Sequence, residues 1–294
     1  MSLDLHLPAH GRGRGLAPAL RQLLQAPPGS WDLPELPAIG GPLLDTGAVA
    51  ASQRLAAQQL GAEHCWYGVN GASGLLQAAL LALTPPGSRV LLPRNLHRSL
   101  LHACVLGQLE PLLYGLPFAA ASGLWQPPSA AQLAEVIAQA QASGPVAAVV
   151  LVSPTYQGLT AELEALAAVV HAAGLPLLVD GAHGQGQAIA AGADLEVLSL
   201  QKSAGGLAQS AVLLAQGPRV DPEAIARSLL WLQTSSPSAL LLASCEAAIA
   251  ELCSAGGRRR RAAASLVGQR LQRRCQALGL PLVANDDPLR LVLH

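Results

Sequence analysis

The apolar residues of this chain fall into two alternating patterns along most of its length. Apolar positions at helical spacing predict amphipathic helices, whereas short runs that are apolar throughout are typical of strands buried on both faces. The predicted helices cover residues 17–25, 46–60, 75–83, 130–142 and 163–173, and the predicted strands cover 65–69, 89–92, 146–152, 175–179, 195–198 and 211–214. This alternation predicts an α/β fold, in which a mostly parallel sheet lies between helices.

The pattern changes near residue 238, after which longer helical stretches dominate. Helices are predicted over 239–254 and 261–278, and strands over 281–284 and 289–293. We therefore expect three parts: an N-terminal helix with an extended arm (1–45), a large domain (46–238), and the start of a smaller α+β domain (239–294).

Polar residues that can do chemistry follow the predicted strands. They are Asn70 to Ser73, His97, Thr155 and Tyr156, Asp180 to His183, and Ser199 to Lys202. In sheets of this kind, ligands bind beyond the C-terminal ends of the strands. The sequence therefore predicts one site, built from loops that are far apart in the chain.

Composition narrows the class of protein. Half of the residues are apolar and only 12% are charged, which excludes a disordered chain. The net charge is zero, which argues against nucleic acid as a partner. No apolar run is long enough for a membrane helix, and no apolar stretch follows Arg12 and Arg14 as it would in a signal peptide.

The five cysteines are odd in number and form no CxxC pair, so neither a disulfide framework nor a zinc site is expected. The histidines lack ligand spacing such as HExxH, and we expect no metal. A reducing cytoplasm fits this cysteine usage best.

Lys202 is the single lysine, and the other 17 of the 18 basic residues are arginines. Arginine supplies charge but its guanidinium stays protonated, so it cannot act as a nucleophilic amine. A lysine kept in such a chain suggests a Schiff base with a carbonyl or with pyridoxal 5'-phosphate (PLP). Chance survival of one surface lysine is the alternative, and composition alone does not separate the two.

The segment from Asp180 to Gly184 follows a buried strand. A carboxylate there needs a positive partner, and a pyridinium nitrogen would be one. Ala182 is small enough to lie under a flat ring, and His183 can hydrogen-bond the ring hydroxyl or the substrate. A turn with a capping aspartate is the competing interpretation. Ser199, three residues before Lys202, can donate to a phosphate.

Two further loops allow both a functional and a plain structural interpretation. Free N–H groups after Asn70, together with the Ser73 hydroxyl, can form a phosphate cradle, although Asn-Gly is often only a turn. His97 can stack on a cofactor ring, or simply bond backbone at a helix start. Thr155 and Tyr156 offer two hydroxyls in the loop after another strand.

Taken together, these residues resemble the bacterial Orn/Lys/Arg decarboxylases, within the fold-type-I (aspartate-aminotransferase-like) PLP enzymes. The resemblance runs from about Asp32 to the C-terminus. It rests on the segments 32–36, 70–74, 94–99, 153–158, 180–184, 199–202, 209–210 and 233–238.

The resemblance implies a role for each matched residue. Lys202 would carry PLP as an aldimine, Asp180 would pair with the ring nitrogen, and His97 would stack on the ring. The phosphate would be held by Ala72, Ser73 and Ser199, and the other implied cofactor contacts are Gly71, Thr155, Ala182, His183 and Gln201. Lys202, His97 and His183 would be the catalytic residues, and residues 234–237 would lie at a homodimer interface. The implied reaction is decarboxylation of arginine, lysine or ornithine, as in polyamine biosynthesis.

The chain also departs from the family pattern. Gly181 replaces the usual glutamate of Asp-Glu-Ala-His, and Leu200-Gln201 replaces the Thr-His that usually precedes the lysine. The segment between His183 and Asp194 is short, and the family's full C-terminal domain is not seen, so we expect weak or absent decarboxylation. A homologue that binds PLP or a partner without turnover, or another PLP-dependent lyase or aminotransferase, is the alternative function.

Overall fold

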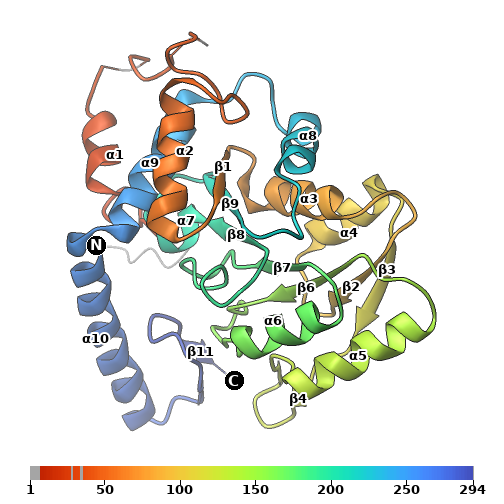
Figure 1. Cartoon of the computed structure of the whole chain (residues 1–294). Coiled ribbons are helices and arrows are strands. Elements are labelled where there is room, and N and C mark those ends of the chain that lie inside the picture. Colours follow the sequence, from red (N-terminus) through yellow and green to blue (C-terminus); the bar gives the residue numbers. More distant parts are fainter. Residues whose placement is uncertain (1–6, 28, 34–35, 294) are drawn as a thin grey trace.

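The computed structural model describes residues 7–27, 29–33 and 36–293 (Figure 1). Its helices are α1 (Pro18–Leu23), α2 (Gly47–Leu60), α3 (Gly71–Leu83), α4 (Arg98–Leu106), α5 (Ala130–Ala142), α6 (Leu163–Ala172), α7 (Leu200–Ser203), α8 (Pro222–Leu232), α9 (Ala239–Cys253) and α10 (Ala255–Ala277). Its strands are β1 (His64–Gly68), β2 (Arg89–Pro93), β3 (Glu110–Tyr114), β4 (Phe118–Ala119), β5 (Leu124–Trp125), β6 (Ala148–Val152), β7 (Leu177–Asp180), β8 (Leu195–Ser199), β9 (Ala211–Ala215), β10 (Leu282–Val283) and β11 (Val292–Leu293).

Seven strands form the central sheet in the order β1-β9-β8-β7-β6-β2-β3. Strands β3, β2, β6, β7 and β8 are parallel, and β9 pairs antiparallel with both β8 and β1. The expected mostly parallel sheet is confirmed, and β9 is its antiparallel member. Strand direction carries no sequence signal here, because β9 is as apolar throughout as its parallel neighbours.

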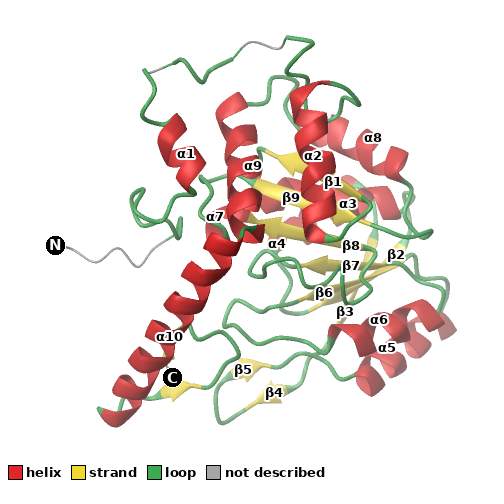
Figure 2. Ribbon diagram, turned by 60° about the vertical axis from the view of Figure 1, so that its left-hand side comes forward, coloured by secondary structure: helices red, strands yellow, loops and turns green. Residues whose placement is uncertain are grey.

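Helices cover both faces of the sheet (Figure 2). One face packs on α3, α4 and α8 through a large aliphatic cluster that includes Leu80, Leu100 and Leu229. On the opposite face, α2 and α9 cover one half and α5 and α6 the other half. Alternate residues of each strand therefore face different helix layers, which explains why the strands are apolar along their whole length.

Several elements begin or occur where the apolar pattern did not predict them. Helices α4, α7 and α8 and strands β3, β4 and β5 were not predicted. Helix α10 begins at Ala255, six residues before the predicted start, because the Ser254 hydroxyl accepts the N–H of Gly257 and caps the helix ahead of the arginine run. Figure 2 shows α10 extending away from the sheet, with β11 near its far end.

Helix α9 packs on α2 and shares a buried cluster with β1 and β9, so this helix lies against the sheet itself. Among the described residues, no single helix is long and apolar enough to cross a membrane, and only the bent pair α9 and α10 meets that test together.

Candidate active site

The C-terminal ends of the strands bring the expected loops to one edge of the sheet. Gly68 at the end of β1 and Ser199 at the end of β8 both pair with Ala211 of β9. The loop that starts α3 therefore lies two strands from the turn that carries Lys202. Asp180 ends β7, the next strand after β8 in the sheet order.

Lys202 lies in the short helix α7, directly after β8. Its Nζ atom lies 3.2 Å from Nε2 of His183. Burial lowers the pKa of Lys202, and the positive charge of Arg290 acts in the same direction while Asp180 opposes both. A lowered pKa increases the fraction of neutral amine, which is the nucleophilic form.

His183 lies in the loop after β7 and contacts both Lys202 and Tyr156. Burial, together with the positive charges of Lys202 and Arg290, lowers the pKa of His183 to about 3. The ring is therefore neutral near pH 7, and its Nε2 can accept a hydrogen bond from Lys202. The ring also meets Tyr156 edge-on, with centroids 5.3 Å apart.

Asp180 is only 5% exposed. Its Oδ1 accepts the N–H of Ala182 at 3.1 Å, and no cationic side chain of the described residues forms an ion pair with it. Burial raises the pKa of Asp180, while the Ala182 hydrogen bond and the charges of His97 and Lys202 lower it. A carboxylate in this setting is stabilised by any further positive partner.

His97 caps the N-terminus of α4. Its Nδ1 lies 2.8 Å from the Ser99 hydroxyl and also accepts the Ser99 N–H at 3.3 Å. The structure thus shows the hydrogen bond to backbone at the helix start, and His97 is otherwise exposed. Burial of part of the ring lowers the pKa of His97, and Asp180 partly opposes this shift.

The start of α3 offers backbone donors. Asn70 precedes the helix and makes no side-chain capping bond, and Ser73 lies exposed in the first turn. Gly71 adopts a φ of 68°, a conformation that favours glycine, and donates its N–H to Gln209 O at 2.9 Å. Ala72 is half-buried beside them, so the first turn remains open to an anion.

The remaining expected residues lie around this centre with different exposure. Ser199 and Ala182 are buried, and Gln201 is half-buried, with its carbonyl accepting the N–H of Ala9. Thr155 is buried too, but its hydroxyl accepts the N–H of Leu159 within its own loop.

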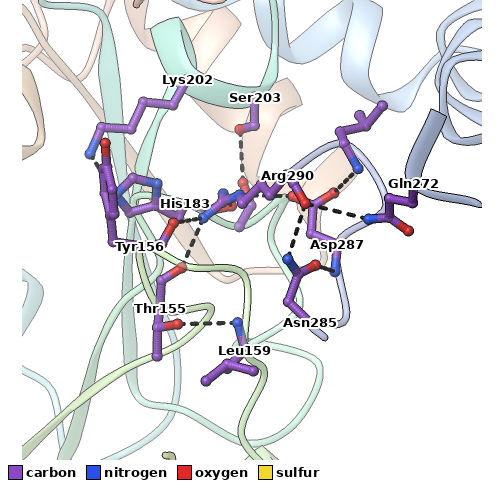
Figure 3. Close-up of polar contacts among 12 residues, drawn as sticks. Thr155, Tyr156, Leu159, His183, Lys202, Ser203, Gln272, Asn285, Asp287 and Arg290 are labelled. Atoms are coloured by element: carbon purple, nitrogen blue, oxygen red, sulfur yellow. Dashed lines mark hydrogen bonds and ion pairs between the residues drawn. The ribbon is translucent and has the colours of Figure 1, made fainter. Parts of the chain in front are cut away.

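Arg290 is a residue of this site that the sequence did not reveal. Its Nη1 donates to the carbonyls of Thr155 and Tyr156 at 2.8 Å, and its Nη2 donates to the carbonyl of His183 at 2.9 Å. Its Nε pairs with Asp287 at 2.9 Å. Figure 3 shows this guanidinium between the two loops. Arg290 therefore ties the C-terminal hairpin to the loops that carry Tyr156 and His183.

A second contact reinforces this attachment. The Asp286 carboxylate accepts the Thr160 N–H at 2.7 Å and the Thr160 hydroxyl at 2.6 Å. The backbone N–H of Asp286 donates to Gly158 O. The turn between β10 and β11 thus covers one side of the site.

A groove of about 1170 Å³ opens beside Lys202 and His183. Its charged lining has six cationic side chains and two acidic ones: Arg14, Arg21, Lys202, Arg260, Arg261 and Arg290, with Glu251 and Asp287. Both acids are paired with arginines of the same groove, Glu251 with Arg260 and Asp287 with Arg290. The groove is therefore net positive.

Comparison with known proteins defines the class and then the family. The overall fold is that of the fold-type-I enzymes. A lysine decarboxylase from E. coli superposes with a TM-score of 0.74 at 20% identity, over 94% of this chain and 42% of that one. A serine palmitoyltransferase from S. paucimobilis superposes with a TM-score of 0.67 at 19% identity, over 94% and 69%. The model of the Orn/Lys/Arg decarboxylase major domain matches residues 4–278, and the chain belongs to that family.

Curated relatives agree with this assignment. An arginine decarboxylase from Bacillus subtilis is 29% identical over 99% of this chain and 63% of its own length. One from Halalkalibacterium halodurans is 31% identical over 86% of this chain and 53% of its own length. The chain thus spans between about half and two thirds of the length of these relatives.

Proposed function

We propose that this chain is a PLP-dependent decarboxylase of a basic amino acid, with arginine, lysine and ornithine as the candidate substrates. The observation that carries the proposal is the position of Lys202, the only side-chain amine of the chain, next to a neutral His183 and near a buried Asp180. Family membership and the names of the relatives support the reaction type.

The residues of the site fit PLP chemically. Lys202 offers an amine for the aldehyde carbon, and Asp180 is a buried carboxylate without an ion-pair partner among the described residues. The uncapped first turn of α3, with Gly71 to Ser73, and the buried Ser199 would hold the phosphate. Ala182 and the exposed ring of His97 would flank the pyridine ring.

PLP, when bound, supplies a ring that accepts the electron pair released as carbon dioxide leaves. The chain's own residues hold charge and protons around it. Asp180 would stabilise a proton on the ring nitrogen of bound PLP, because a buried carboxylate favours a paired cation. Lys202 Nζ can take or return a proton, since its pKa is lowered by burial. We assign reprotonation of the substrate carbon to Lys202 or His97.

His183 acts on Lys202 rather than as a charged acid. In the tautomer that leaves Nε2 without a proton, this atom accepts a hydrogen bond from Nζ and so fixes the direction of the amine. The Tyr156 ring packs edge-on against His183, and the turn held by Arg290 binds the His183 carbonyl, so both keep this ring in place.

A second substrate class is favoured by the charge of the groove. Six cationic and two acidic side chains line it, and both acids are already paired. Such a lining attracts anions. A PLP-dependent lyase or aminotransferase that acts on an acidic amino acid is therefore the second candidate.

We also propose a homodimer. Leu230 and Trp231, near the end of α8, are 66% and 77% exposed, and they lie shortly before residues 234–237, which the family resemblance assigns to the interface. Exposed large apolar groups of this kind mark protein contacts. Light scattering at micromolar concentration tests this, and a monomer would refute it. A cytoplasmic location, which the five free thiols support, is likewise proposed.

The test of function supplies the protein with PLP and measures amine product and carbon dioxide from arginine, lysine and ornithine, with glutamate and aspartate alongside. Product from a basic amino acid, lost in Lys202→Arg, supports the decarboxylase. Turnover of an acidic amino acid alone favours the second candidate. Cofactor binding without any product would contradict both and indicate a non-catalytic homologue.

A further inference from the structure

Glu196 is a carboxylate in the middle of an otherwise apolar strand. It lies in β8 and is 1% exposed. In register, it pairs with Val179 of β7 and Leu214 of β9, so it faces the helix layer opposite to that of Val197. A buried carboxylate is costly unless its oxygens are hydrogen-bonded, so its partners reveal what it does.

Both partners of Glu196 come from the far end of the loop that carries His183. Oε2 accepts the N–H of Ala188 at 3.0 Å and the N–H of Ile189 at 3.1 Å. These are two backbone donors that would otherwise be buried without a partner. The carboxylate thus fixes the end of the segment that began at Asp180.

The same side chain also touches the beginning of this loop. A Cβ at position 181 would lie 2.7 Å from Oε1 of Glu196, closer than real Cβ atoms come, and 3.1 Å from its Cγ, which is a tight contact. Gly181 stands between Asp180 and Ala182, and it is buried. The Glu196 side chain therefore fills the space that a side chain at position 181 would otherwise occupy.

We propose that Glu196 is the positioning residue of the Gly181–Ile189 loop: it holds both ends of the loop and so sets where His183 meets Lys202. Gly181 is the residue that leaves room for it. Only the chemical purpose of the His183–Lys202 contact rests on the proposed function, because the loop geometry does not depend on the cofactor. Arg290 and Ser203 hold the middle of the loop, at the carbonyls of His183 and Gly184.

The position of His183 can be measured without PLP. The ring of His183 stays neutral because it is buried and because Lys202, Arg290 and His97 repel a proton. If the loop moves, the ring leaves these groups and its pKa rises toward the ordinary value for histidine, about 6.5. Proton NMR of the ring, assigned with a His183→Gln variant, reports this shift. Hydrogen exchange at Ala188 and Ile189 reports the two backbone bonds.

The test compares Glu196→Val, which removes both acceptors, with Glu196→Gln, which keeps the shape and one acceptor oxygen, and with Glu164→Gln, an exposed control. We expect Glu196→Val to speed exchange of both amides by about tenfold or more and to let His183 gain a proton above pH ~5. Glu196→Gln should largely preserve both properties. Unchanged exchange and an unchanged His183 in Glu196→Val would overturn the proposal.

If Glu196→Val does not fold, Gly181→Ala tests the contact between positions 181 and 196 instead. The added methyl should displace the Glu196 carboxylate, so that exchange at Ala188 and Ile189 speeds up and the His183 ring gains a proton at higher pH than in the parent. Unchanged exchange and an unchanged His183 in Gly181→Ala would also overturn the proposal. A parent protein that fails to bind PLP would refute the proposed function but leave these readouts intact, so the two failures are distinguishable.

Discussion

Nζ of Lys202 lies 3.2 Å from Nε2 of His183, and the two side chains come from loops after neighbouring strands. The imidazole is neutral because burial and the nearby charges of Lys202 and Arg290 lower its pKa to about 3. Because it carries no charge, its Nε2 can accept a hydrogen bond from the amine without taking the proton. This pair links the fold to the proposed chemistry, since it directs the amine.

Replacing His183 should show that this residue orients Lys202 and is not required to bind PLP. In His183→Phe the amine loses its acceptor while the ring volume is kept. We expect PLP to bind still and the rate of product formation to fall by roughly 10²-fold, because a misplaced reacting group can cost that much. Turnover with saturating PLP, compared with a direct titration of the cofactor, is the measurement. An unchanged rate would remove His183 from the site.

Asp180→Asn should weaken cofactor binding. The buried carboxylate would lose its charge, and with it the partner of the ring nitrogen; breaking a buried ion pair costs roughly 3–5 kcal/mol. The dissociation constant for PLP, measured from its bound absorbance, should rise strongly, while the fold, measured by circular dichroism, stays the same. Equal affinity in the variant and the parent would mean that the role of Asp180 is wrongly assigned.

Arg290→Ala should release the turn between β10 and β11 from the site. Three backbone carbonyls and Asp287 lose their partner, and hydrogen bonds to a charged group contribute roughly 1.5–3 kcal/mol each at most. We expect faster hydrogen exchange over residues 155–160 and 285–290. Arg290→Lys should retain only part of the protection, because an ammonium cannot reproduce the planar fork. Arg270→Ala, on the exposed face of α10, is the control.

Glu196 gives a pH dependence with a definite sign. Burial raises the pKa of this carboxyl from 4.5 to about 7 in the folded chain. The stability contributed by the protonated form is fully present below pH ~4.5 and is lost as the pH rises through 7, a change of roughly 3 kcal/mol. Urea unfolding between pH 5 and 8 should show this loss in the parent and not in Glu196→Gln. The same slope in both proteins would contradict it.

The elements with regular apolar spacing could be predicted from the sequence, and those defined by a single contact could not. Helix α5 begins after Ser129, whose capping box with Gln132 is a local signal, and its bounds match those predicted. The antiparallel direction of β9 leaves no such trace. Helix α10 starts earlier than predicted because its capping serine precedes two glycines, which obscured the helical pattern.

The residues of the candidate site also fall into those with a local sequence signal and those without one. Lys202 could be proposed from the sequence because it is the single lysine, and Asp180 because a carboxylate directly follows a buried strand. Arg290 is one arginine among many, and the carbonyls that it binds in the site lie more than a hundred residues away in sequence, so no local pattern points to it. Glu196 did leave a signal: a charged residue inside an apolar strand has to be satisfied within the core.

Borohydride reduction of the protein with bound PLP, followed by peptide mapping, shows directly whether Lys202 holds the cofactor. Reduction fixes the cofactor to the amine that carries it. We expect a single pyridoxyl label on Lys202, and loss of both the label and the bound-cofactor absorbance in Lys202→Arg, with the fold unchanged. A label found only at the N-terminal amine would contradict it.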